Sequence, residues 1–332
     1  MQRNFHLDQM RVISCIMVIA IHVCNIYNRD FPDLPQVNYI IASIVNAFSR
    51  ISVPIFFMVS GALMAGKTPD ISKSLKRFFK YLIITVFWFV FYLLWKTLYM
   101  QSDYDFHDIL TTPTSNHLWF LYALLSIYLA LPIIQTLIRA LPEKMLYYMM
   151  VLFALSVFGG YILDAFSIPV KYPIAVIAEN QYLGYFILGY VCYNNKDRIK
   201  TSVLVSVFLA CGMLASFITI YVSYIGGEHN EFVFQYRNPL LVFMSASAFM
   251  LMMRFPKQSI PQAWEKFVSH ISKNSFGIYV FHAVFLNVLD KNIDIPSVPA
   301  WCGIIVFTAI ILLLSDICVH IFRKIKYINY FF

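Results

Sequence analysis

Charged residues are scarce in this chain. Asp, Glu, Lys and Arg make up 13% of its 332 residues, whereas a soluble globular domain carries about 25%. Hydrophobic residues make up 60%, and the mean hydropathy is +0.69. The 11 glycines and 14 prolines are too few for a disordered chain, and the apolar runs are too long for barrel strands. The composition therefore predicts an all-α polytopic membrane protein.

Cysteine is also sparse and scattered. None of the six cysteines forms a CxxC pair, so the sequence predicts neither a metal site nor a framework of disulfides. We expect all six to be small hydrophobic residues within apolar segments. They are Cys15, Cys24, Cys192, Cys211, Cys302 and Cys318.

Apolar runs separated by polar segments predict about ten membrane-spanning helices. No A-x-A cleavage site follows the first run, so we interpret it as a span rather than a signal peptide. We find no repeat and no room for a separate soluble domain, so residues 1–332 are expected to form one integral-membrane domain. The predicted spans are 11–27, 41–65, 78–99, 117–138, 145–163, 181–193, 203–225, 238–253, 274–290 and 300–321.

The distribution of basic residues predicts the orientation. If the spans alternate from a cytoplasmic N-terminus, nineteen Lys and Arg lie on the cytoplasmic side and four on the other. This asymmetry follows the positive-inside rule and places both termini in the cytoplasm. The net charge of +8 then marks the inner membrane face and its lipids, and gives no argument for nucleic acid.

Two ionisable residues share one face of the first predicted span. Eleven residues separate Arg11 from His22, which brings a helix back to within about 20° of its starting direction and advances it by about 16 Å. Arg11 would lie at the membrane boundary and His22 deep in the bilayer. Ionisable groups at that depth are costly and usually functional; the alternative is a neutral histidine that bonds a neighbouring helix.

Further polar residues fall in later spans. Ser275, Tyr279 and His282 recur at helical spacing on one face of the ninth span. Arg50 lies near the start of the second span, where a side chain that snorkels to the interface is the alternative. Asp316 and His320 are spaced for a local ion pair in the last span.

Two segments at the membrane boundaries suggest substrate contacts. In SKSLKRFFKY, Lys76, Arg77 and Lys80 are expected to hold the phosphates of a cytosolic donor, or else to anchor the inner face. In NHLWFLY, His117 and Trp119 have the chemistry of a sugar site, or else form part of an aromatic belt.

Four blocks in order resemble the membrane acyltransferase-3 family. They are LDQMR with the R-x10-H pattern of Arg11 and His22, SRISVPIFFMVSGALM, NHLWFLYALLSIYLALPIIQ and SKNSFGIYVFHAVFL, and the likeness runs from about residue 6 to residue 290. The chain is most similar to short stand-alone enterobacterial inner-membrane O-acetyltransferases of the enterobacterial common antigen type. One departure is Val12, where the family usually has glycine; it changes packing beside Arg11 and leaves the charge in place.

The resemblance implies a multi-pass enzyme of the bacterial cytoplasmic (inner) membrane. Such an enzyme moves an acyl group, usually acetyl, from cytosolic acyl-CoA to a hydroxyl of a cell-surface or lipid-linked glycan. Acetyl-CoA or another acyl-CoA would be the donor substrate, with no permanently bound cofactor. By the family pattern His22 is the catalytic base, Arg11 its partner and Asp8 an acid that orients Arg11. The other residues expected to bind substrate are Arg50, His117, Trp119, Tyr279 and His282.

Two questions stay open at this point. The transfer can be direct or can pass through an acyl-histidine. A multispan transporter or flippase for sugar-linked or small polar substrates would also contain buried Arg and His residues. Against that alternative, the two halves of the chain show neither internal symmetry nor matching helices broken by Gly or Pro.

Overall fold

The computed structural model of the chain is all-helical. It describes residues 4–102, 104, 112–168, 180–256 and 260–332, and this part of the chain contains no β-strand. The α-helices are α1 (Phe5–Arg29), α2 (Gln36–Ser49), α3 (Ser52–Met64), α4 (Ile71–Leu98), α5 (Trp119–Ala140), α6 (Glu143–Ala165), α7 (Gln181–Asn194), α8 (Thr201–Gly226), α9 (Pro239–Met253), α10 (Gln262–Asn292) and α11 (Ala300–Phe322). The 3-10 helices are η2 (Asn116–Leu118), η3 (Phe232–Phe234), η5 (Ile295–Ser297) and η6 (Ile328–Phe331).

Seven helical segments in the described residues are long and apolar enough to cross a membrane. They are α1, α2 with α3, α4, η2 with α5, α6, α8 and α11. The other three predicted spans also form helices, but α7 and α9 are only 14 and 15 residues long, and α10 falls outside the apolar set. The all-α membrane class is therefore confirmed, whereas the number ten and the position of the termini stay predictions.

Side-chain caps explain where several helices begin. Asn4 accepts hydrogen bonds from the backbone N–H groups of His6 and Leu7 and so starts α1. Asp70 caps α4 in the same way, and Asn180 caps α7. Each cap satisfies N–H groups that have no partner in the first helical turn.

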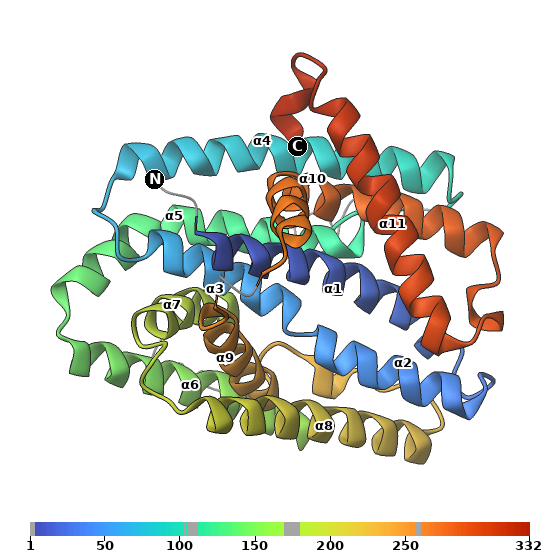
Figure 1. Cartoon of the computed structure of the whole chain (residues 1–332), viewed down its shortest axis with the longest axis horizontal. Helices are drawn as coiled ribbons and strands as arrows, with labels where there is room; N and C mark the ends of the chain where they lie inside the picture. Colours follow the sequence, from blue (N-terminus) through green and yellow to red (C-terminus); the bar gives the residue numbers. More distant parts are fainter. Residues whose placement is uncertain (1–3, 103, 105–111, 169–179, 257–259) are drawn as a thin grey trace.

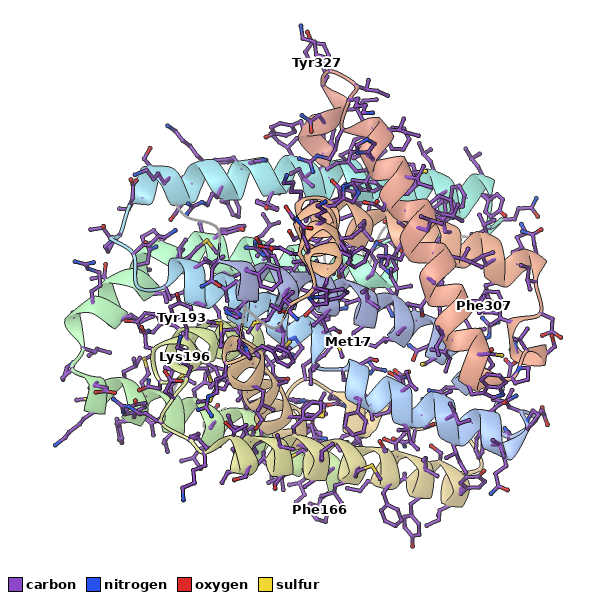
Figure 2. The ribbon with its side chains drawn as sticks, viewed as in Figure 1. Met17, Phe166, Tyr193, Lys196, Phe307 and Tyr327 are labelled. Atoms are coloured by element: carbon purple, nitrogen blue, oxygen red, sulfur yellow. The ribbon has the colours of Figure 1, made fainter. Side chains whose placement is uncertain are left out.

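Helix α1 lies in the middle of the molecule. It packs against α2, α3, α9, α10 and α11, and most long helices run near its direction in Figure 1. Met17, halfway along α1, lies near the centre of the view in Figure 2, whereas Phe166 and Tyr327 lie at its edges. A central helix is consistent with the burial of 14 of its 25 residues.

The second predicted span is broken between α2 and α3. Arg50 and Ile51 form a turn between the two helices. Pro54 lies four residues after Arg50 and has no N–H to donate to the Arg50 carbonyl, which removes one hydrogen bond of a regular helix and favours a break at this point. The break turns the Arg50 side chain toward the loop that contains Glu231.

Candidate active site

Four side chains from three elements meet beside the middle of α1. The His22 ring lies 5.1 Å, centroid to centroid, from the ring of His282 on α10. His117 on η2 lies 5.0 Å from His282, and Tyr279 lies 5.8 Å from His117. We call His22, His117, Tyr279 and His282 the histidine cluster. The structure therefore brings together residues that are up to 260 positions apart in the chain.

Two of the three histidines are held by hydrogen bonds. His117 lies with Nδ1 3.0 Å from the Ser115 hydroxyl and with Nε2 3.3 Å from the Val280 carbonyl. His282 directs Nδ1 at the Tyr279 carbonyl oxygen, 2.5 Å away. Because carbonyl oxygens only accept, each of these rings donates through the nitrogen that faces the backbone.

His22 differs from the other two histidines. It is partly exposed rather than buried, and among the described residues neither of its ring nitrogens has a hydrogen-bond partner. The neighbouring His282 is fully buried, and its Nε2 also lacks a partner in the described part of the chain. Both nitrogens of His22 and Nε2 of His282 are therefore available to a bound molecule.

The Arg11 cavity reaches the histidine cluster from one side. It has a volume of about 270 Å³ and is lined by Arg11, Ser60, Tyr128, Ser275 and Tyr279 among others. The guanidinium of Arg11 lies 3.1 Å from the Asp8 carboxylate, one helical turn earlier. Arg11 therefore has the acidic neighbour that the sequence predicted, and it shares a cavity with Tyr279 of the cluster.

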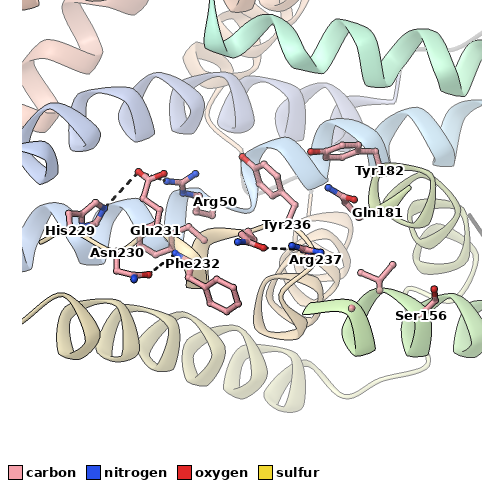
Figure 3. Close-up of a pocket in the computed structure, with 14 residues that line it drawn as sticks. Arg50, Ser156, Gln181, Tyr182, His229, Asn230, Glu231, Phe232, Tyr236 and Arg237 are labelled. Atoms are coloured by element: carbon pink, nitrogen blue, oxygen red, sulfur yellow. Dashed lines mark hydrogen bonds and ion pairs between the residues drawn. The ribbon is translucent and has the colours of Figure 1, made fainter. Parts of the chain in front are cut away.

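A second space, the polar cavity, has a volume of about 870 Å³. Figure 3 shows Arg50, Glu231 and His229 at one end of this cavity, with Tyr236, Tyr182, Gln181 and Arg237 along it. It therefore combines charged, amide and aromatic side chains. His22 lies close enough to interact with the charges of both Arg50 and Glu231.

Arg50 is a buried cation at the wall of the polar cavity. Its side chain donates to Asn46 Oδ1 at 3.0 Å and to Glu231 Oε1 at 3.5 Å, and the guanidinium lies 4.7 Å from the centre of the Phe234 ring. His229 Nε2 lies 3.8 Å from the same carboxylate. Interaction with His229 and the positive charge of Arg50 lower the pKa of Glu231, against the opposing effect of burial.

An aromatic recess adjoins the polar cavity. It has a volume of about 400 Å³ and is lined by Trp119, Tyr122, Ala123, Asn180, Gln181 and Tyr182. The ring of Trp119 stacks on that of Tyr182, with centroids 4.9 Å apart. Gln181 and Tyr182 line both spaces, so Trp119 lies next to the polar cavity rather than inside it.

The basic pocket differs from the predicted donor site. Its volume is about 390 Å³, and Lys67, Lys73, Arg77 and Arg139 line it. Of the three predicted residues only Arg77 lines this pocket. Lys76 is exposed, and Lys80 extends along α4 to lie 5.5 Å from the centre of the Tyr330 ring. The pocket lies at the beginning of α4, and Lys80 is about 10 Å further along the helix than Lys73.

The expected Asp316–His320 ion pair is wrong. Asp316 instead accepts hydrogen bonds from His270 Nε2 at 2.8 Å and Asn274 Nδ2 at 2.7 Å, both on α10. Packing of α11 on α10 brings these partners closer to Asp316 than the local one. The contact joins the two helices on the Arg11 side of the molecule.

Several residues at the site were not singled out by the sequence. His229, Tyr236 and Arg237 lie in the connection between α8 and α9, which reads as an ordinary polar loop, and Gln181 begins α7. The one sequence feature that could have identified them is that the short connection between α8 and α9 contains Glu231 together with a histidine and an arginine. In the described residues no group of three or more His, Cys, Asp or Glu side chains is placed to hold a metal ion.

Comparison with known proteins identifies the family. A family model described as "Acyltransferase domain", that of acyltransferase-3, matches residues 4–320. No curated protein and no solved structure matches the chain. The matched range contains the histidine cluster, both cavities and the basic pocket. With seven helical segments of the described residues able to cross a membrane and this match over nearly its whole length, the chain belongs to the acyltransferase-3 family of membrane acyltransferases.

Proposed function

We propose that this protein is a membrane O-acyltransferase that moves an acetyl group from cytosolic acetyl-CoA to a hydroxyl of a glycan. The proposal includes the bacterial inner membrane as its location and an activity of the enterobacterial O-acetyltransferase type. One observation supports it above all: the histidine cluster contributes Tyr279 to the Arg11 cavity, and His22 interacts electrostatically with Arg50 and Glu231 at the wall of the polar cavity. The acyl donor would bind in the Arg11 cavity, and the acceptor would bind in the polar cavity.

The donor would approach from the basic side of the molecule. Acyl-CoA carries phosphates on its nucleotide, and clustered Lys and Arg side chains suit phosphate oxygens. Arg77 with Lys67, Lys73 and Arg139 supplies such a cluster in the basic pocket. Arg11, held by Asp8, would bind the donor closer to the thioester, and the cavity leads on to Tyr279.

The acceptor would bind in the polar cavity. Sugar rings present hydroxyls around an apolar face, and the cavity offers both hydrogen-bonding groups and aromatic rings. Gln181, Arg237 and Glu231 would bond hydroxyls, while Tyr182 and Tyr236 would contact ring faces. Trp119 in the adjoining aromatic recess would contact a further part of a larger saccharide.

His22 would act as the general base. As the hydroxyl oxygen attacks the thioester carbon, the imidazole takes the hydroxyl proton; the carbon–sulfur bond then breaks and CoA leaves as the thiolate, which is protonated. Arg50, which is close enough to interact electrostatically with His22, would stabilise the negative charge that develops on the carbonyl oxygen. An acyl-histidine intermediate would use the same groups in two steps.

Replacing His22 with alanine tests the proposal. In membranes supplied with [14C]acetyl-CoA, we expect transfer of label to glycan to fall at least about 100-fold, the effect of removing a general base. His320→Ala is the matched control, because His320 is exposed on α11 and lies outside the cluster; its transfer should equal that of the unaltered protein. Equal transfer by His22→Ala and the control would reject the catalytic role.

A further inference from the structure

An apolar groove lies between α6, α7 and α9, beside the polar cavity. It has a volume of about 170 Å³, and Phe153 and Ala154 on α6, Leu188 on α7 and Phe243 on α9 line it. Almost no polar surface lies along these walls. A space of this kind suits hydrocarbon and is unfavourable for a sugar or a nucleotide.

The apolar groove is continuous with the polar cavity. Val157, Gln181 and Tyr236 line both spaces. Gly160, one turn further along α6, lines the polar cavity, and there is open space where a side chain would begin. One bound molecule can therefore extend from the polar cavity into the groove, provided that one part of it is polar and the other is apolar.

The groove is also accessible from the bilayer. Helix α6 buries only Leu146 and Val157 of its 23 residues, and Phe243 on the opposite wall is 53% exposed. In an apolar helix that qualifies as a membrane span, surface left uncovered by protein faces lipid. A hydrocarbon chain could enter the groove sideways without leaving the membrane.

We propose that the acceptor is a glycolipid, with its hydrocarbon chain in the apolar groove and its saccharide in the polar cavity. This inference rests on the proposed acyltransferase function and restricts the acceptor to a saccharide attached to lipid, as opposed to a finished, water-soluble polymer. The apolar groove suits the hydrocarbon chain of the glycolipid, and the polar cavity suits its saccharide. Val157, Gln181 and Tyr236, which line both spaces, lie where the two parts of the molecule would join.

The lipid attachment of the product tests the inference. Native membranes that contain the protein are incubated with [14C]acetyl-CoA and extracted with organic solvent. The label that depends on His22, which is the difference between the unaltered protein and His22→Ala, is then measured in each phase. We expect this label in the organic phase, and we expect it to move to the aqueous phase when the sugar is cleaved from its lipid by mild acid. Label in water-soluble polymer from the earliest times would overturn the inference, as would label that remains in a lipid without sugar.

Variants that fill the apolar groove provide a second test of the inference. Ala154→Trp should lower His22-dependent labelling of glycolipid at least fivefold by raising the apparent KM for the acceptor, with the KM for acetyl-CoA unchanged. Leu188→Trp fills the groove from the other wall and should act in the same direction. Leu155→Trp is the matched control, because Leu155 is the next residue on α6 and is 64% exposed, away from the groove.

The outcomes separate this inference from the proposed function. If no label depends on His22, the acyltransferase mechanism fails and the inference falls with it. If label depends on His22 but both groove variants equal Leu155→Trp, transfer stands and the glycolipid site is wrong. Thermal melting of each variant shows whether a loss comes from unfolding, and a groove variant that melts normally decides the result.

Discussion

At the scale of single residues, the three histidines of the cluster have different surroundings. His117 and His282 are oriented by backbone carbonyls, whereas the ring of His22 lies beside that of His282 and has no hydrogen-bond partner among the described residues. A general base needs a nitrogen that is not already bonded. Both His22 and His282 meet this requirement, and of the two only His22 is partly exposed, which supports His22 as the base.

Arg11 and Arg29 lie near opposite ends of the same helix, which allows a matched comparison. Arg11→Ala is expected to raise the KM for acetyl-CoA about 10- to 100-fold, since losing one charged contact costs about 1.5–3 kcal/mol. Arg29→Ala removes an ion pair with Asp290 far from the cavities and should leave this KM unchanged. Steady-state kinetics in native membranes measure both; equal KM values would exclude Arg11 from donor binding.

Glu231 predicts a pH dependence of stability. Its pKa is lowered below the usual value of 4.5 in the folded protein, so the carboxylate stabilises the fold fully above about pH 4.5 and loses this effect as pH falls through the lower, folded value. Glu231→Gln should therefore lower the melting temperature by a constant amount from pH 8 to pH 5. The difference should shrink below pH 4.5. A difference that grew on acidification would contradict this assignment.

The sequence predicted the cluster better than it predicted the cavities. His22, Tyr279 and His282 were recognisable because ionisable or polar side chains are rare in apolar spans. His229 and Arg237 were not, because polar residues are ordinary in a loop and their position at a cavity depends on tertiary packing. A cluster of Lys and Arg was predicted, but of its predicted members only Arg77 lines the basic pocket, and Arg139 comes to it from α5.

At the scale of helices, close contact between α3 and α7 depends on two glycines. A methyl group at Gly61 would overlap the Phe186 carbonyl, and one at Gly189 would overlap the backbone of Met58. Small residues of this kind let membrane helices approach closely. The contact places Tyr182 and Gln181 of α7 beside the polar cavity.

Alanine at these glycines is expected to destabilise the protein. Gly189→Ala should cost roughly 1–3 kcal/mol by overpacking, seen as a lower melting temperature in detergent. Gly159→Ala on α6 is the control, because no atom lies within 4 Å of the added methyl group. That variant should be as stable as the unaltered protein or slightly more so, since alanine favours helix. Equal melting of the two variants would contradict the packing argument.

The positions of the helices were predicted more accurately than the breaks within them. Each of the ten apolar runs is mostly helical, because apolar length is the dominant local signal. The break at Arg50 was not predicted, since Pro54 alone does not reveal which turn will open. The position of α10 on α11 was also missed, and with it the partner of Asp316.

For the whole molecule, the charge distribution predicts which side faces the cytoplasm. The connection between α3 and α4 and the end of α8 lie at opposite ends of the long axis. In a variant without the six native cysteines, Thr68→Cys should resist a membrane-impermeant maleimide in intact cells, whereas Glu228→Cys should react. Both positions are exposed. The reverse pattern would invert the orientation and place the basic pocket away from cytosolic acyl-CoA.

The uninterrupted course of α1 limits how this protein can vary. No proline or glycine occurs between Phe5 and Arg29, so a single inserted or deleted residue between Arg11 and His22 would swing the imidazole by about 100°. Without a glycine or proline nearby, the helix has no flexible point at which the backbone could compensate for that rotation. Homologous chains should therefore accept many apolar replacements along this stretch and yet conserve its length, which makes α1 a molecular ruler between the two ends of the reaction path.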